Sequence, residues 1–168
     1  YGGNPGQPTE EGLYKDARAQ IDWLADKHGI KGDDLILYGE SIGSAVAVQM
    51  ATEYEAKALV LEVPFSSALD VARFKFFFIP FLSKTMKDQY LSDKKIVSVN
   101  IPVFMGIGAR DMVVTARFGK KLFAAANEPK TLKVYEKGSH NNLYYHGFPQ
   151  DAMAFLKTLE PKEEASKP

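Results

Sequence analysis

The chain contains no cysteine among its 168 residues. Disulfide bonds and thiolate metal sites are therefore excluded. Histidine is also scarce, because the chain has only three, and their spacing matches no His-x-x-x-His or similar ligand pair. We therefore expect neither a metal nor a cofactor in this protein.

The sequence has no excess of charge of either sign and no long hydrophobic run. Lys and Arg together number 21, and so do Asp and Glu. This balance gives no global field that would attract nucleic acid or an anionic membrane. The most apolar stretch, residues 76–82, is far shorter than the ~18 residues of a membrane span. We expect no nucleic-acid partner, and membrane association only through sequence upstream of Tyr1.

The length and the hydrophobic content of the chain, 45% of its residues, suit one domain with a buried core. We expect this domain over residues 1–159 and a polar tail over residues 160–168. The chain begins with Tyr1, not methionine, in a loop rich in glycine and proline. This start is typical of a cut through a longer protein.

Short apolar runs alternate with helical patterns along the chain. The expected strands cover residues 35–38, 58–61, 103–107 and 132–135, and the expected helices residues 10–28, 44–53, 68–75, 116–126 and 149–159. Thr9 can cap the first helix, and Gly29 can end it. This alternation predicts a mainly parallel sheet with helices on both faces, a three-layer α/β/α sandwich.

A Gly-x-Ser-x-Gly pentapeptide, Gly39 to Gly43, lies between the first expected strand and the helix that follows it. The pattern predicts a tight turn that holds the Ser41 hydroxyl above the sheet edge. We expect both glycines to be needed, because a side chain at either would collide with neighbouring backbone. Ser41 is therefore the candidate nucleophile, and the alternative is a purely structural turn. Three nearby serines lack such a turn: Ser44, Ser66 and Ser67.

A serine hydroxyl needs a base to remove its proton, and that base needs an acid to fix its tautomer. Asp111 follows the third expected strand and His140 follows the fourth. Carboxyl ends of parallel strands meet at one edge of a sheet, so we interpret Asp111 as the acid and His140 as the base. The alternatives for the acid are Asp70 and Asp93, which we expect to be solvated. The alternative for the base is His146, near the start of the last helix.

The reaction would also need backbone N–H groups to hold an oxyanion. One donor should be the amide of Ile42, which follows Ser41. The second donor normally belongs to a loop after an earlier strand, and no such strand precedes Thr9. We therefore expect only half of the oxyanion site.

The segment at about 64–95, between the second and third strands, is rich in phenylalanine and forms a short lid-like insertion. Its rings could bind an acyl chain, but we favour the interpretation that they cover the core. We expect its lysines to be solvated: Lys84, Lys87, Lys94 and Lys95.

These motifs resemble the α/β-hydrolase superfamily. Within it they are most similar to the bud-emergence-type hydrolases, the α/β-hydrolase-domain proteins and the serine aminopeptidase-like domains. The similar segments are residues 8–14, 37–44, 61–65, 108–114 and 138–144. The resemblance covers nearly the whole chain and implies Ser41 as nucleophile, Asp111 as acid and His140 as base.

The chain departs from the family pattern in two respects. Ile107 stands where the family usually has a histidine, outside the triad. The family's first strands and their oxyanion loop are absent. The resemblance therefore implies the C-terminal part of an α/β-hydrolase fold, truncated at its N-terminus and impaired in turnover.

Together these features predict a serine hydrolase that cleaves acyl esters or thioesters through an acyl-enzyme at Ser41. The alternatives are an aminopeptidase-like peptidase and a non-catalytic hydrolase fragment that only binds. The expected partner is a small-molecule or lipid-like acyl substrate. Self-association is also expected, because the strand at 35–38 would have one unpaired edge.

Overall fold

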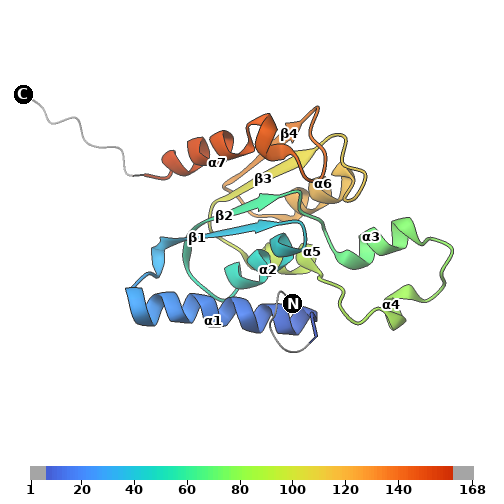
Figure 1. The fold of residues 1–168 in the computed structure, drawn as a ribbon, viewed down its shortest axis with the longest axis horizontal. Coiled ribbons are helices and arrows are strands. Elements are labelled where there is room, and N and C mark those ends of the chain that lie inside the picture. The colour runs from blue at the N-terminus through green and yellow to red at the C-terminus, as the bar shows by residue number, and fades with distance from the viewer. Residues whose placement is uncertain (1–6, 161–168) are drawn as a thin grey trace, which may run out of the picture.

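The computed structural model describes residues 7–160 and contains one parallel sheet flanked by helices (Figure 1). Its strands are β1 (Gly32–Glu40), β2 (Ala56–Glu62), β3 (Val103–Gly108) and β4 (Lys130–Tyr135). They lie side by side in sequence order, and every pair is parallel. The predicted strands are confirmed, and all but β3 begin at least two residues before the apolar run that predicted them. The predicted tail lies almost entirely outside the described residues.

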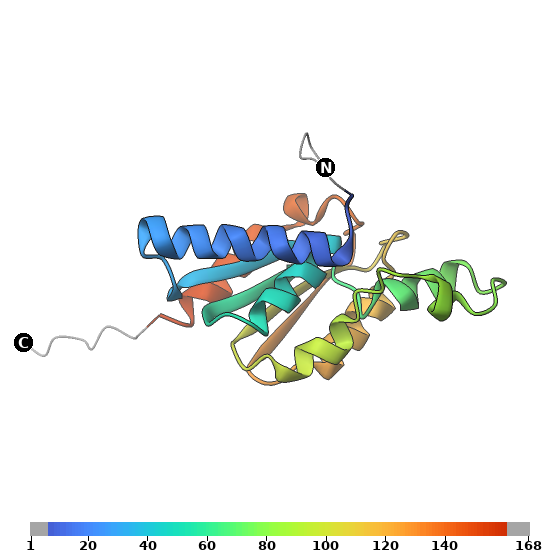
Figure 2. The same ribbon diagram turned by 90° about the horizontal axis from the view of Figure 1, so that it is seen from below.

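Helices cover both faces of the sheet and complete three layers (Figures 1 and 2). One face is covered by α7 (Phe148–Lys157), and the other by α1 (Glu10–His28), α2 (Ile42–Ala51) and α6 (Ala116–Ala125). Shorter helices lie between them: α3 (Ala68–Lys75), α4 (Leu82–Thr85), α5 (Ser92–Lys95), η1 (Ile96–Ser98) and η2 (Leu143–His146). Within residues 7–160, no helix combines the length and the apolar character that crossing a bilayer requires.

Each face of the sheet has its own hydrophobic cluster, because successive side chains of a strand point to opposite faces. Leu59 and Leu61 of β2 are fully buried with the residues of α1, α2 and α6. Val60, between them, packs with Phe148 of α7 on the other face. This alternation holds the helices in place on both sides.

The first helix begins and ends where its sequence predicts. The Thr9 hydroxyl accepts a hydrogen bond from the Gly12 amide (3.1 Å) and so caps the N-terminus. Gly29 takes the left-handed conformation (φ 68°) and donates its N–H to the Ala25 carbonyl (3.0 Å). The predicted bounds of this helix are confirmed.

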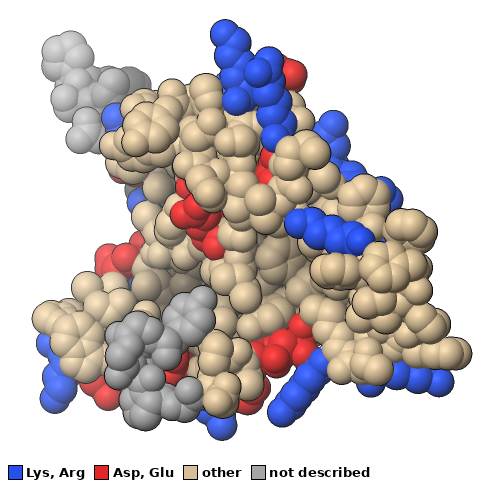
Figure 3. Space-filling model, turned by 45° about the vertical axis from the view of Figure 1, so that its right-hand side comes forward, with Lys and Arg blue, Asp and Glu red and all other residues tan. Residues whose placement is uncertain are grey.

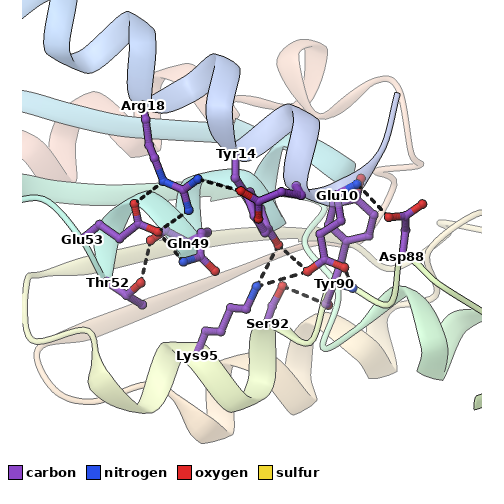
Figure 4. Close-up of polar contacts among 11 residues, drawn as sticks. Glu10, Tyr14, Arg18, Gln49, Thr52, Glu53, Asp88, Tyr90, Ser92 and Lys95 are labelled. Carbon is purple, nitrogen blue, oxygen red and sulfur yellow. Dashed lines mark hydrogen bonds and ion pairs between the residues drawn. The ribbon is translucent and has the colours of Figure 1, made fainter. Parts of the chain in front are cut away.

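Glu10, in the first turn of α1, ties that helix to the segment that precedes β3 (Figure 4). Its Oε1 atom accepts hydrogen bonds from the Tyr14 hydroxyl (2.7 Å) and Lys95 Nζ (3.2 Å). Its Oε2 atom accepts the Tyr90 amide (2.9 Å), and its own amide donates to Asp88 Oδ1 (2.9 Å). One carboxylate thus joins parts of the chain that lie 80 or more positions apart.

The charge of Glu10 is stabilised in the folded protein. Burial alone would raise the pKa of this carboxyl, but the hydrogen bonds from Tyr90, Tyr14 and Lys95 outweigh burial and hold the pKa below its usual range. A lowered folded-state pKa adds stability above the unfolded pKa of about 4.3, and this stability is lost as the pH falls through the folded pKa. The expectation that Lys95 is solvated is wrong, because its ammonium lies between Glu10 and Tyr14.

Glu10→Gln is expected to lower the free energy of unfolding by about 1–2 kcal/mol near pH 7, because the Lys95 ammonium loses its carboxylate partner. The difference from wild type should shrink as the pH falls through the folded-state pKa of Glu10, because the wild-type carboxyl then also gains a proton. Urea unfolding followed by circular dichroism, at pH 7 and over a series of acidic pH values, measures this. Glu11→Gln is the matched control, since that side chain is 62% exposed and its one ion pair within residues 7–160 is with Arg18. Equal losses in the two variants would contradict the assignment.

Candidate active site

Ser41 lies at the tight turn between β1 and α2. Its backbone angles, φ 50° and ψ −117°, fall in a region that residues other than glycine rarely adopt. The Ser41 amide donates to the Glu62 carbonyl (3.0 Å) at the end of β2, which fixes the turn against the neighbouring strand. Ser44 is buried and its hydroxyl donates to the Ser41 carbonyl. Of these two serines, Ser41 is therefore the one whose hydroxyl is directed away from the helix.

The two glycines of the pentapeptide have different reasons to be there. A Cβ atom at Gly39 would overlap the carbonyl of Gly43, so the close approach of strand and helix requires glycine at that position. A Cβ atom at Gly43 would meet nothing within 4 Å outside its own helix turn. The expectation that both glycines avoid a collision is therefore right for Gly39 and wrong for Gly43.

Gly39→Ala is expected to destabilise the protein by about 1–3 kcal/mol, because the turn must open to admit the methyl group. Gly43→Ala is the matched control, and it should be neutral or stabilising by up to about 1 kcal/mol, since alanine favours a helix over glycine. Denaturant unfolding of both variants measures the difference. Two variants of equal stability would show that strand and helix can separate at no cost.

Asp111 is 3% exposed and lies in the loop that follows β3. Its Oδ1 atom accepts the amides of Val113 and Val114, both at 2.8 Å. Its Oδ2 atom is thereby directed to His140, whose Nδ1 lies 2.8 Å away. Two amides of its own loop thus orient the Asp111 carboxylate independently of His140.

His140 lies in the loop after β4, and a close backbone contact brings this loop to the Asp111 loop. The Gly138 carbonyl accepts the Arg110 amide (2.9 Å), and a Cβ atom at Gly108 would overlap that same carbonyl. On its far side, the His140 ring places Nε2 at 3.0 Å from the Ser41 hydroxyl oxygen. The structure therefore brings together the three residues that the sequence singled out, from loops at three strand ends.

The rival candidates lie elsewhere. Asp70 and Asp93 both pair with Lys121, at 2.5 and 2.9 Å, so the expectation that they are solvated is wrong. His146 ends η2 and is exposed, and its side chain forms no hydrogen bond to another residue of the described range 7–160. Ser67 caps α3 by accepting the Asp70 amide (2.9 Å). None of these side chains forms a hydrogen bond with the Ser41 hydroxyl.

Glu62 is a buried carboxyl beside the site that the sequence reasoning did not single out. It is 8% exposed at the end of β2, next to Ser41, and accepts a hydrogen bond from the Tyr38 hydroxyl (2.6 Å). Burial, with a smaller effect of Glu40, raises the pKa of Glu62, and the Tyr38 hydrogen bond only partly offsets this. The available signal in the sequence was an acidic residue directly after the apolar run at residues 58–61.

The arrangement provides a route for a proton. Carboxylate, imidazole and hydroxyl form one hydrogen-bonded chain, so the imidazole can accept the hydroxyl proton while the carboxylate holds its other nitrogen. The Ile42 amide, in the first turn of α2, has no acceptor among residues 7–160. It is free to donate to an oxygen that bears negative charge close to Ser41.

Comparison with known proteins identifies relatives of the chain. No protein-family model matches it. An uncharacterized protein of Mycobacterium tuberculosis is 40% identical over 142 residues, which are 84% of this chain and 50% of that protein. Human alpha/beta hydrolase domain-containing protein 17B is 33% identical over 150 residues, 88% of this chain and 49% of that protein. The chain thus spans about half the length of these curated relatives.

Solved structures show the same fold. The Pyrococcus furiosus esterase Pf2001 superposes with a TM-score of 0.70, covering 93% of this chain and 65% of that one. The two sequences are 21% identical, so this likeness concerns the fold. The three-layer α/β/α architecture predicted from the sequence is confirmed.

Proposed function

Because the chain belongs to the α/β-hydrolase superfamily, we propose that it is a serine hydrolase that cleaves acyl esters or thioesters. One observation carries the proposal. His140 lies between Ser41 and Asp111, with one ring nitrogen 3.0 Å from the serine hydroxyl and the other 2.8 Å from the carboxylate. These are hydrogen-bonding distances, so the three groups are arranged for nucleophilic catalysis.

In the proposed reaction the Ser41 oxygen attacks the acyl carbonyl carbon while His140 Nε2 takes the serine proton. The tetrahedral intermediate carries an oxyanion, to which the Ile42 amide donates. His140 then gives its proton to the departing alcohol or thiol, and an acyl-enzyme remains on Ser41. A water molecule, deprotonated by His140, attacks the acyl-enzyme; the bond to the Ser41 oxygen breaks, His140 returns its proton to that oxygen, and the acid is released.

Asp111 acts through His140 in this scheme. Its Oδ2 atom accepts the Nδ1 proton, which leaves Nε2 unprotonated and ready to take the serine proton. It also stabilises the imidazolium that forms in the transition state. The amides of Val113 and Val114 hold the carboxylate in place during both steps.

The proposal of an acyl substrate is supported by exposed apolar side chains that lie close to the triad residues in the chain. Ile42 and Met112, next to Ser41 and Asp111, are 45% and 83% exposed. Tyr144, four residues after His140, is 69% exposed. Apolar surface of this kind favours contact with the hydrocarbon part of a substrate.

Ser41→Ala is expected to abolish labelling by a fluorophosphonate probe and to lower turnover of a p-nitrophenyl ester by up to roughly 10⁶-fold, because the nucleophile is removed. In-gel fluorescence and an absorbance assay measure the two effects. Ser44→Ala is the matched control and should still be labelled, since the Ser44 hydroxyl is bound to a backbone carbonyl. Labelling that persists in Ser41→Ala would overturn the assignment, and a wild-type protein that is never labelled would favour the non-catalytic alternative.

Asp111→Asn is expected to lower ester turnover by roughly 10⁴-fold, because an amide group facing His140 Nδ1 favours the tautomer that cannot accept the serine proton. Asp93→Asn is the matched control, because Asp93 pairs with Lys121 away from the triad. Steady-state kinetics of both variants, with thermal unfolding to check the fold, provides the measurement. A similar loss in the two variants would show that Asp111 is not the acid.

A further inference from the structure

One short segment of this neutral chain concentrates both aromatic residues and positive charge. Between Val71 and Lys87 the sequence has four Lys and Arg residues and no Asp or Glu. The same stretch contains five of the eleven phenylalanines. We call residues 71–87, which include most of α3 and all of α4, the aromatic arm.

The rings at the tip of the aromatic arm face solvent. Phe77 is 84% exposed, Phe78 68% and Phe81 70%, so the interpretation that these rings cover the core is wrong. Phe78 contacts Phe77 and Phe76, with ring centres 5.8 and 6.4 Å apart. Figures 1 and 2 both show α3 and α4 projecting beyond the layers of the fold. A contiguous apolar surface of this kind marks an interaction site.

The positive charges of the arm are also exposed: Arg73, Lys75, Lys84 and Lys87. None of them forms an ion pair with another residue of the described part of the chain. Lys84 Nζ lies 5.4 Å from the centre of the Phe81 ring, so charge and apolar surface adjoin. Figure 3 shows the side of the molecule that carries the arm, where blue side chains border a broad tan surface.

The body of the protein holds the aromatic arm at both ends. Lys121 of α6 pairs with Asp70, just before the arm, and with Asp93, after it. Asp88, the first residue after the arm, accepts the Glu10 amide (2.9 Å). The arm is therefore presented to solvent by fixed attachments to α1 and α6.

We propose that the aromatic arm docks on an anionic lipid bilayer. The rings of Phe77, Phe78 and Phe81 enter the boundary between headgroups and acyl chains, and Lys84 and Lys87 contact the headgroup phosphates. An anionic bilayer is an apolar medium beneath a negatively charged surface, and the arm presents an apolar tip with unpaired positive charges around it. This complementarity of charge is what favours a lipid surface as the occupant.

Docking would place the lipid surface on the side of the protein where the arm leaves the body, near the candidate active site. The chain enters α3 at Ala68, six residues after Glu62, whose carbonyl binds the Ser41 amide. The proposal does not depend on hydrolysis, since the arm contains none of the triad residues. Ser41→Ala should therefore bind vesicles as wild type does, so membrane binding and catalysis can fail separately.

Co-sedimentation of the 168-residue protein with lipid vesicles tests the proposal. Wild type should bind vesicles of roughly three parts phosphatidylcholine to one part phosphatidylserine, and more weakly those of phosphatidylcholine alone. The double variant Phe77→Ser and Phe78→Ser should bind about 100-fold more weakly, at about tenfold for each ring. Trp23→Ser, at an exposed aromatic residue of α1, is the matched control and should bind as wild type does.

The lysines are tested separately. Lys84→Gln and Lys87→Gln together should weaken binding to the anionic vesicles about 25-fold, at about fivefold for each lysine, and should leave binding to neutral vesicles unchanged. All of these substitutions are at exposed positions, so the thermal unfolding midpoints should match that of wild type.

Fluorescence provides a second, independent readout, because Trp23 is the only tryptophan. In the double variant Trp23→Phe and Phe78→Trp, anionic vesicles should shift the emission to shorter wavelength, and brominated lipids should quench it. Trp23 of the wild type should show neither effect.

The proposal is overturned if wild type binds neither kind of vesicle, or if Trp23→Ser weakens binding as much as the phenylalanine variant does. It is also overturned if the single indole of Trp23→Phe, Phe78→Trp stays in water when that variant is bound to vesicles. It is also overturned if the arm instead joins two copies of the chain, seen as a dimer that the phenylalanine substitutions dissociate.

Discussion

The parallel register of the four strands determines where every chemical group of the site can lie. Glu40 of β1 pairs with Glu62 of β2, and Gly108 of β3 pairs with Tyr135 of β4, so all four strands end at one edge of the sheet. Each loop that follows a strand therefore starts next to the others, and residues up to 99 positions apart come within hydrogen-bonding distance. Antiparallel strands would alternate their carboxyl ends between two edges and would separate these loops.

Close backbone contacts convert this proximity into a defined geometry. Glycine at position 39 lets α2 start against the end of β1, and glycine at position 108 lets the loops after β3 and β4 touch. Each contact is too close to admit even one methyl group, and the hydrogen bond from the Arg110 amide to the Gly138 carbonyl holds the two loops together. Hydrogen bonds then orient the polar side chains, as the two amides that hold Asp111 illustrate. Backbone packing thus sets positions, and hydrogen bonds set orientation.

The polar contacts away from the site have a different role. Glu10 and Lys121 each join segments that are distant in sequence, and both hold the chain close to where the aromatic arm leaves and rejoins the body. The contacts of Glu10 are partly buried, and they gain more than surface ion pairs because its carboxylate also accepts a backbone amide. The apolar tip of the arm is therefore exposed, while both ends of the arm are held by the body of the protein. The net charge of the whole chain is zero, but the arm itself has four positive residues and no negative ones.

The sequence by itself determined the elements and the identity of the candidate site. Hydrophobic periodicity located the strands and the main helices, and Thr9 and Gly29 marked the ends of α1. The turn around Ser41 could be predicted because all of its residues are adjacent in the chain. Only the tertiary structure decided the long-range contacts: that Lys95 binds Glu10, that Glu62 is buried beside Ser41, and that the rings of the arm face solvent. The physical reason is that periodicity reports which face of an element is apolar. Partners, burial and exposure depend on which segments the fold brings together, and that information does not lie in any local stretch of sequence.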